Sequence, residues 1–276
     1  MARINDKLVF ESFSTTHEFM RAVTSRPQND KTPDNRGREG KNDFCGGLSW
    51  DESIDALWNG LPETCKTLQS DLRQFRENGT VNLGNRSVPR NYYYGSKPNV
   101  PAALAGKPKS MRQRQRLPQK VKTVRIIYDQ CQNADTSAMT LKQSGTAVLC
   151  LVYALEKSGY RVKFDLLPFA SQTRNECAIS VVNLKGFRQP LDLLKLSFPI
   201  THPAMFRRFG FTWLETVENL GPFYHCHGHH IDRETMLERL KDAKVLDTNA
   251  YLIQIDDCKN ANFDVRAIAK NLGISL

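Results

Sequence analysis

The stretch "VKTVRIIYDQCQNADTSAMTLKQSGTAVLCLVYALEKSGYRVKFDLLPF", residues 121–169, carries the strongest pattern in the chain. It opens with a β-branched run that ends at Asp129, which predicts a strand. The core candidates of that strand are Val124, Ile126 and Ile127. Apolar residues then recur at helical spacing over 137–159, and the helix expected there ends at a glycine. The segment that follows alternates at its start, as a half-exposed strand does. The stretch therefore predicts a strand, a helix and a second strand in succession.

The C-terminal side continues this alternation. "CAISVVNLKG" (177–186) predicts a strand, and the turn-rich "ASQTRNE" before it allows a hairpin with the preceding strand. Helices are expected at 189–198, within 202–219, at 232–244 and at 264–273, and a last strand is expected at 249–258. This order of elements is typical of an α/β sandwich with a largely parallel sheet.

The N-terminal side is helical and irregular by comparison. A short helix is expected from Thr15 or Thr16, and the polar segment 26–44 indicates a mobile loop or linker. Ser49 or Asp51 can cap a further helix that ends at Gly60, and another is expected across 62–77. We therefore divide the chain into an N-terminal helix and flexible linker (1–44), a helical region (45–106), a basic connector (107–120) and an α/β domain (121–276).

The positive charge of the chain is concentrated in one segment. The formal net charge is +10, and residues 78–128 contain eleven Lys and Arg but no Asp or Glu. Elsewhere the other 28 of the 39 basic residues are balanced by the 29 acidic ones, so this segment carries the whole excess. Such a block attracts a polyanion such as nucleic acid, or an anionic surface. Its prolines and glycines exclude long regular structure, although a short helix fits at 99–106.

The same segment combines cations with aromatic side chains. Arg and Lys neutralise phosphates and release counterions, while aromatic faces stack on unpaired bases at about 1–3 kcal/mol each. In an extended chain "RQRQR" would present its three arginines on one edge, because they are two residues apart. The candidate nucleic-acid-binding residues are Arg90, Tyr92, Tyr93, Tyr94, Lys97, Lys107, Lys109, Arg112, Arg114, Arg116 and Lys120. The alternatives are a surface for a protein partner and a connector that lies against the acidic remainder of the chain.

Other local patterns point to chemistry less directly. In "YHCHGHH" (224–230), His225, His227 and His229 alternate, so an extended strand would gather three imidazoles, as a zinc site with an open position requires. The alternative is an exposed polar loop. "ALAGKPKS" lacks the spacing of a phosphate-binding loop, and neither a GxSxG elbow nor a dinucleotide fingerprint is present. Asp256 and Asp257 at a strand end support no more than a turn.

Arginines, cysteines and hydropathy add three further expectations. In "HPAMFRRF" we expect a helix whose aromatic residues enter the core while one arginine pairs with a carboxylate; the alternative is that Arg207 or Arg208 serves an anion-binding face. Scattered cysteines in apolar segments predict reduced core thiols and an intracellular compartment; they are Cys131, Cys150 and Cys177. Apolar runs such as "TAVLCLVYAL" are too short to span a bilayer, and no N-terminal signal is visible.

Two stretches resemble a family of uncharacterised bacteriophage proteins. One is "LSWDESIDALWNGLPE" with "PNVPAALAGKPKSM", and the other is "VRIIYDQC" and the helix after it with "LSFPITHPAMFRRFGF". The resemblance covers roughly residues 45–260. It implies a phage origin and a C-terminal von Willebrand A-like (Rossmann-type) three-layer sandwich, and it supplies no catalytic activity.

A metal-binding A domain carries Asp-x-Ser-x-Ser after its first strand, because a carboxylate and two hydroxyls suit a hard cation. The corresponding residues here are Asp129, Cys131 and Asn133. A thiol is a soft ligand that Mg²⁺ rejects. Asp129 is therefore expected to end the strand and turn the chain, and a cation site is the alternative.

These observations predict a binding protein rather than an enzyme, without a cofactor or a metal. We expect a phage-encoded accessory protein that binds nucleic acid, with single-stranded DNA or RNA preferred, and acts in phage transcription or replication. The expected partners are nucleic acid and phage or host transcription or replication proteins, not a membrane, in the cytoplasm of the infected host cell. The alternatives are a von Willebrand A-like protein–protein interaction module, with its contact surface near Asp129 and Asp256, and a zinc-dependent activity at 225–230.

Overall fold

A computed structural model describes residues 2–5, 8–27, 43–78, 87–116, 122–133, 135–173, 176–217 and 230–274. Its main body is built on a six-stranded sheet in the order β1-β2-β8-β7-β6-β9. The strands are β1 (Ala2–Asn5), β2 (Leu8–Phe13), β8 (Cys177–Lys185), β7 (Tyr160–Gln172), β6 (Lys122–Asp129) and β9 (Ala250–Gln254). β6 runs parallel to β7 and β9, and β2 runs parallel to β8, whereas β1–β2 and β7–β8 are antiparallel pairs. The predicted α/β class and the β7–β8 hairpin are thus confirmed.

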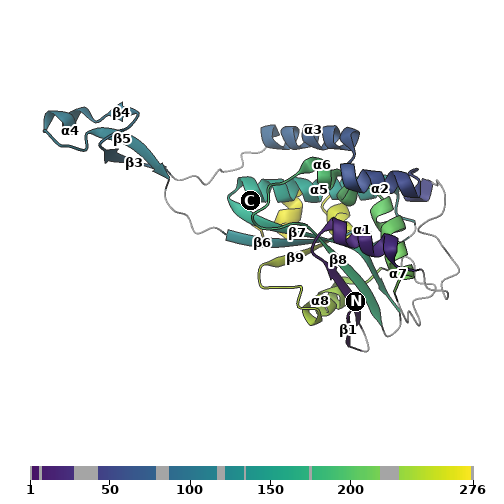
Figure 1. Cartoon of the computed structure of the whole chain (residues 1–276). Coiled ribbons are helices and arrows are strands. Elements are labelled where there is room, and N and C mark those ends of the chain that lie inside the picture. The colour runs from purple at the N-terminus through teal and green to yellow at the C-terminus, as the bar shows by residue number, and fades with distance from the viewer. Residues whose placement is uncertain are drawn as a thin grey trace.

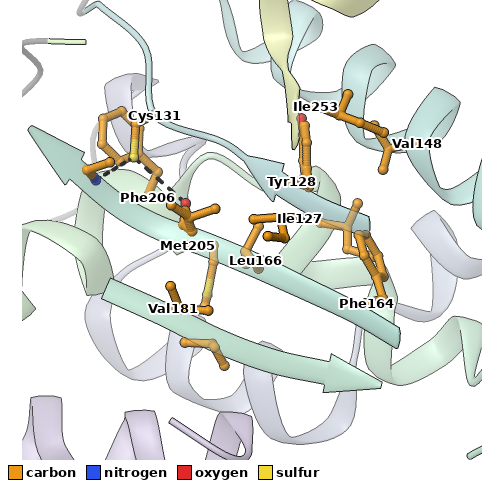
Figure 2. Packing of buried hydrophobic residues seen from close by; sticks show 14 of the residues in the cluster. Ile127, Tyr128, Cys131, Val148, Phe164, Leu166, Val181, Met205, Phe206 and Ile253 are labelled. Atoms are coloured by element: carbon orange, nitrogen blue, oxygen red, sulfur yellow. Dashed lines mark hydrogen bonds between the residues drawn. The ribbon is translucent and has the colours of Figure 1, made fainter. Parts of the chain in front are cut away.

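The strand β6, which lies between β7 and β9, is buried on both faces. Ile126 and Tyr128 point to one side and Ile127 and Asp129 to the other, because side chains alternate across a strand, and all four are 0 % exposed. Apolar residues on both faces are typical of a strand inside a parallel sheet. Figure 2 shows Ile127 and Tyr128 packed with Phe164 and Leu166 of β7, Ile253 of β9 and Val148 of the neighbouring helix.

Helices cover both sides of the sheet. In Figure 1, α2, α3, α5 and α6 lie above the sheet and α8 lies below it. The helices of the body are α1 (Thr16–Ser25), α2 (Trp50–Asn59), α3 (Pro62–Asn78), α5 (Ala138–Lys157), α6 (Leu193–Thr201), α7 (Phe211–Glu215), α8 (Arg233–Asp242), α9 (Ile255–Asn260) and α10 (Val265–Asn271). The helices predicted from the sequence are present within a few residues. α9 occupies the second half of the segment expected as the last strand.

Helix α5 has the length and hydropathy of a membrane span, and it is the one such helix among the described residues. The apolar run within it had suggested a segment too short to span a bilayer. However, 61 % of its most apolar window is buried inside the protein. At Gly145 a Cβ would lie 2.1 Å from the carbonyl oxygen of Ile200, so α5 and α6 approach closely at this point. α5 is therefore packed as the core helix of the body.

The N-terminal residues take part in the main sheet instead of forming a separate unit. α1 is present as predicted, and the Thr15 hydroxyl accepts a hydrogen bond from the Glu18 amide at 3.1 Å. The strands before it were not predicted. β2 adds to the sheet through its pairing with β8, in which Leu8 lies opposite Cys177. The expected division at residue 44 therefore cuts across the main body.

Arg207 and Arg208 lie in the core, where they hold the chain segment 43–48. They belong to a π-helical segment, η2 (Met205–Gly210), which leads directly into α7. Arg207 donates to the carbonyl oxygens of Phe44 and Thr136, and Arg208 donates to that of Leu48. The predicted burial of the flanking aromatic residues is confirmed. Because both arginines are at most 3 % exposed, an anion-binding face at this position is excluded.

His202 lies beside this segment and stacks on Phe198, with 5.1 Å between the ring centroids. Burial lowers its pKa to about 4 from the ordinary 6.5; the charge of Arg208 acts in the same direction, and a hydrogen bond with Gly46 opposes them. A base whose pKa is lower in the folded state takes up a proton on unfolding. The contribution of neutral His202 to the stability of the folded protein is therefore complete above pH 6.5, and it is lost as the pH falls toward 4. A shift of this size corresponds to about 3 kcal/mol.

We expect His202→Asn to remove this pH dependence. Asparagine keeps an acceptor in place of Nδ1, which accepts a hydrogen bond from the Ala204 amide at 3.2 Å. Urea unfolding at pH 7 and pH 4 measures the free energy of unfolding of both proteins. Between pH 7 and pH 4, the free energy of unfolding of the wild type should fall by about 3 kcal/mol more than that of the variant. A difference that stays constant would show that His202 does not titrate in this range.

A second, three-stranded sheet lies apart from the main body in Figure 1. It consists of β3 (Ser87–Tyr92), β5 (Met111–Arg116) and β4 (Lys97–Pro98), with the short helix α4 (Val100–Leu104) between β4 and β5. The order is β3-β5-β4, and both pairings are antiparallel. We call residues 87–116 the arm. The helix expected at 99–106 is present as α4, whereas part of the expected connector 107–120 forms β5, so the proposed boundary at residue 107 cuts through the arm.

Candidate nucleic-acid interface

The arm is held together by backbone contacts more than by a core. Between residues 89 and 114, Ala102 is the one buried residue. The Ser96 amide donates to the Arg112 carbonyl at 3.1 Å, and the Asn99 amide donates to that of Ser110 at 2.7 Å. A Cβ at position 95 would lie 2.4 Å from the Arg112 carbonyl oxygen, so this close approach requires Gly95. The chain can therefore fold back on β5 at Gly95 and leave most arm side chains exposed.

The strand register places the basic residues of β5 on one face. Arg112 lies opposite Asn91 on β3 and opposite Lys97 on β4, and Arg114 lies opposite Pro89. Directly paired residues of an antiparallel ladder point to the same side. Arg112, Arg114 and Lys97 therefore share one face, and all three are exposed. The predicted alternation of the arginines agrees with this arrangement, and β4 adds a cation to it. The backbone of Arg116 continues β5, but its side chain is not among those described.

The tyrosines do not form a single row beside these arginines. Tyr92 is paired with Met111 and therefore lies on the opposite face of the sheet, together with Arg90, which is paired with Gln113. Tyr93 and Tyr94, in the turn after β3, are 67 % and 69 % exposed. The rings of Tyr92 and Tyr94 are 6.3 Å apart and tilted by 36°. The aromatic groups thus surround one end of the small sheet instead of lining its cationic face.

Lysines accompany the aromatic end of the arm. The Nζ atom of Lys109 lies 5.4 Å from the ring centroid of Tyr93, a cation–π distance. Lys107 follows α4 and is exposed. Lys120 lies outside the described residues. The structure therefore brings Lys109 to the tyrosines and Lys97 to the arginines of β5.

The charge of the arm is not neutralised by ion pairs in the described part of the chain. The arm contains no carboxylate of its own. Within the described ranges, the recorded ion pairs involve residues of the main body and none of the cations of the arm. The alternative of a connector that lies against acidic residues of the body therefore has no support from these contacts. Exposed and unpaired cations remain available to a polyanion.

Two exposed apolar residues of the arm were not predicted as site residues. Val100 and Leu104 on α4 are 55 % and 85 % exposed. They are four residues apart and hence lie on the same side of the short helix. The signal was present in the sequence, because a helix was expected at 99–106, but a short helix does not reveal which of its faces will be covered.

Asp129 forms a turn at the end of β6. Its Oδ1 accepts a hydrogen bond from the Cys131 amide at 3.0 Å, and its Oδ2 accepts one from Gln254 Nε2 at 3.1 Å. Burial raises its pKa, although the nearby His230 and the Gln254 hydrogen bond act against that rise. The described residues contain no group of three His, Cys, Asp or Glu side chains that could hold a metal. The contacts of Asp129 are those expected of a residue that turns the chain.

The other candidate positions have structural roles or are outside the described chain. Residues 225–229 of the histidine cluster are not described; His230 is, and its Nε2 lies 3.4 Å from Gln254 Nε2. Asp257 forms an ion pair with Arg233 at 2.6 Å and accepts the Gln254 amide, so it caps α9. Asp256 pairs with Lys259 at 3.2 Å.

The cysteines in the described ranges are free and buried, as predicted for Cys131, Cys150 and Cys177. Figure 2 shows Cys131, whose sulfur accepts a hydrogen bond from the Ala170 amide at 2.8 Å and donates one to the Leu167 carbonyl at 3.7 Å. Burial raises the pKa of Cys131 well above its usual value, and it raises those of Cys150 and Cys258 to about 12. Thiols with such pKa values are protonated at neutral pH and are not nucleophiles.

Comparison with known proteins gives a family but no function. No curated protein and no solved structure matches the chain. One family model matches residues 3–275, a range that includes both the main sheet and the arm. Its description mentions neither a phage nor a von Willebrand A-like fold, so these two expectations are still proposals. The chain belongs to the family described as a domain of unknown function, DUF7192.

Proposed function

We propose that the protein binds nucleic acid through its arm, prefers single strands, and has no catalytic step of its own. The observation that carries this proposal is the shared exposed face of Lys97, Arg112 and Arg114 in a segment without carboxylates. Neighbouring cations at strand spacing can neutralise successive phosphates of one backbone. Each phosphate contact releases counterions and so favours association.

The exposed tyrosines favour an unpaired strand over a duplex. A base can stack on Tyr93 or Tyr94 only when its face is not covered by neighbouring bases. Each such contact is worth about 1–3 kcal/mol and tolerates any base. Since aromatic faces bind DNA and RNA bases alike, the arm would select for single strands and not for a particular sequence.

The cellular setting is a proposal that rests on the sequence resemblance. We place the protein among phage-encoded accessory factors of transcription or replication in the cytoplasm of the infected cell. In the same way, a von Willebrand A-like identity of the main body is supported by the strand β6, which is followed by α5 and the parallel strand β7, and by Asp129 at the end of β6. Such a fold would offer phage or host proteins a contact surface near Asp256. Recovery of partners from infected cells with and without nuclease would separate protein contacts from shared nucleic acid.

The proposal is tested by fluorescence anisotropy with labelled 20-nucleotide single strands, DNA and RNA, and the corresponding duplex. With about four phosphate contacts, log K should fall with log salt concentration at a slope of about −3. Single strands should bind about tenfold more tightly than the duplex if one tyrosine stacks on a base. A poly-glutamate peptide of similar charge is the control for simple polyanion attraction. No binding at low salt, or equal binding of the peptide and the single strand, would contradict the proposal.

A further inference from the structure

The small sheet of the arm has one edge that is only partly covered. β5 is the middle strand of this sheet (Figure 1), and it pairs with β3 along its whole length. On its other side β4 contributes two residues, which lie opposite Met111 and Arg112. Among the strands of the described residues, none pairs with residues 113–116 on that side. This stretch of β5 is therefore an open edge, which we call the β5 edge.

The backbone groups of Arg114 point toward the β5 edge. Residues that face each other in an antiparallel ladder alternate between pairs that exchange backbone hydrogen bonds and pairs that do not. Pro89 lies opposite Arg114 and has no N–H, so this pair is of the second kind. Arg112, two residues earlier, has the same direction, because its carbonyl accepts the Ser96 amide at 3.1 Å on the β4 side. The N–H and C=O of Arg114 are thus directed away from β3, to the side on which β4 has ended.

The two outer edges of the small sheet are closed by prolines. By the same alternation, the backbone of Pro89 points outward from β3. On β4, Pro98 lies opposite Met111 and likewise points outward. A proline at such a position removes a donor and places its ring in the path of an added strand. Residues 113–116 contain no proline, so the β5 edge is the part of the described arm that can accept another strand.

The charge beside the β5 edge determines which kind of strand fits it. The arm, residues 87–116, contains seven Lys and Arg and no Asp or Glu. Arg112 and Arg114 are exposed on one face of the sheet. An added antiparallel strand places a residue directly opposite Arg114 on this face, where an acidic side chain is favourable and a cation is not. A second copy of β5 would bring arginines opposite one another, so charge disfavours self-pairing.

We propose that the β5 edge binds an extended acidic segment of a partner protein, which joins the small sheet as an antiparallel strand. Glutamate or aspartate at every second position of that segment lies on the face of Arg112 and Arg114. In this mode of recognition, backbone hydrogen bonds supply affinity and alternate side chains supply specificity. The proposal uses the backbone of β5, so it does not depend on nucleic-acid binding by the arm.

A blocked peptide of alternating glutamate and threonine is the probe, and isothermal titration calorimetry with the full chain at low salt measures its affinity. A glutamate opposite Arg114 exchanges backbone hydrogen bonds with it, so the glutamate amides face β5 and the threonine amides face outward. N-methylation of the glutamate amides should weaken binding about tenfold or more, because donors are lost and the methyl groups obstruct the approach. N-methylation of the threonine amides keeps the same charge and is the matched control; it should change the affinity by less than about threefold.

Two substitutions at Arg114 separate the backbone from the charge. Arg114→Gln and Arg114→Pro both remove the cation, but only the proline removes the outward N–H. Since Arg114 and Pro89 exchange no backbone hydrogen bond, the arm loses none of its own ladder. Arg114→Pro should therefore bind the peptide about fivefold more weakly than Arg114→Gln does. The N-methylated peptides test the same pairing on the unchanged protein, so the outcome does not depend on the folding of this variant.

The assignment of the β5 edge is wrong if the unmodified peptide does not bind, or if both N-methylated peptides bind equally well. An oligonucleotide titration distinguishes this failure from failure of the proposed function. If oligonucleotides bind and the peptide does not, the edge is not a docking site and the proposed function stands. If the peptide binds with the expected dependence on its glutamate amides and oligonucleotides do not bind, the arm is a docking sheet for proteins and the proposed function is wrong.

Discussion

The triple variant Lys97→Gln/Arg112→Gln/Arg114→Gln is expected to bind a single-stranded oligonucleotide about a hundredfold more weakly than the wild type at low salt. Each exposed phosphate contact contributes on the order of 1 kcal/mol, and about 3 kcal/mol corresponds to this factor. The slope of log K against log salt concentration should also become shallower by about 2, since each phosphate contact contributes about 0.7. Fluorescence anisotropy across a salt series measures both quantities. Glutamine already occupies the positions between the arginines of β5, so the strand should tolerate the change.

The matched control is Lys142→Gln/Lys241→Gln/Lys270→Gln, which removes three exposed lysines from the main body. It changes the net charge by the same amount, and it should reduce the affinity by less than threefold, because distant charges are screened by salt. If both triple variants weaken binding equally, the protein attracts nucleic acid through its overall charge. The arm would then not be the interface.

Replacing Asp165 by Asn is expected to lower the free energy of unfolding by about 3–5 kcal/mol. Asp165 is 1 % exposed, and its partner Arg125 is 12 % exposed, so the substitution leaves a nearly buried guanidinium without its counter-charge. Removing one partner of a buried pair is costly for this reason. Arg125 also donates to the Val245 carbonyl, which keeps the guanidinium in place and prevents it from turning toward water. Urea unfolding followed by circular dichroism gives the free energy.

Asp256→Asn is the control for the loss of an aspartate that forms an ion pair. Its carboxylate pairs with Lys259 at 3.2 Å, but it is 54 % exposed, and exposed pairs contribute at most about 1 kcal/mol. If Asp165→Asn lowers the free energy of unfolding no more than Asp256→Asn does, water reaches Arg125 in the folded protein.

The sequence predicted the elements whose pattern is local and regular. β6, α5, β7 and α8 each show either a dense apolar run or helical spacing with a cap, such as the Asp232 side chain that accepts the Thr235 amide. β2 was missed because it is short and its partner β8 is distant in the sequence. β5 was missed for a different reason. The sequence MRQRQR has neither the β-branched residues nor the apolar alternation of a buried strand, and pairing with β3 and β4 on both sides defines it.

The same distinction applies to the candidate sites. Composition located the cations of the arm, but the face on which each one lies depends on the strand register, so the separation of Tyr92 from Arg112 could not be predicted. The burial of the arginines of η2 could not be predicted from composition either, since the backbone carbonyls of Phe44 and Leu48, to which they donate, lie 163 and 160 residues away in the sequence.

The pairing of β2 with β8 affects how this chain folds during translation. Leu8 finds its partner Cys177 only after 169 further residues have been translated. At about 5–20 residues per second, this takes roughly 8–34 seconds. Throughout that time the edge of β2 that pairs with β8 is open, and Leu8, Val9, Phe10 and Phe13 lie along this strand. An unpaired hydrophobic edge is a start point for aggregation. Nascent chains halted before residue 177 should therefore be retained by ribosome-associated holdase chaperones, and full-length chains should escape them.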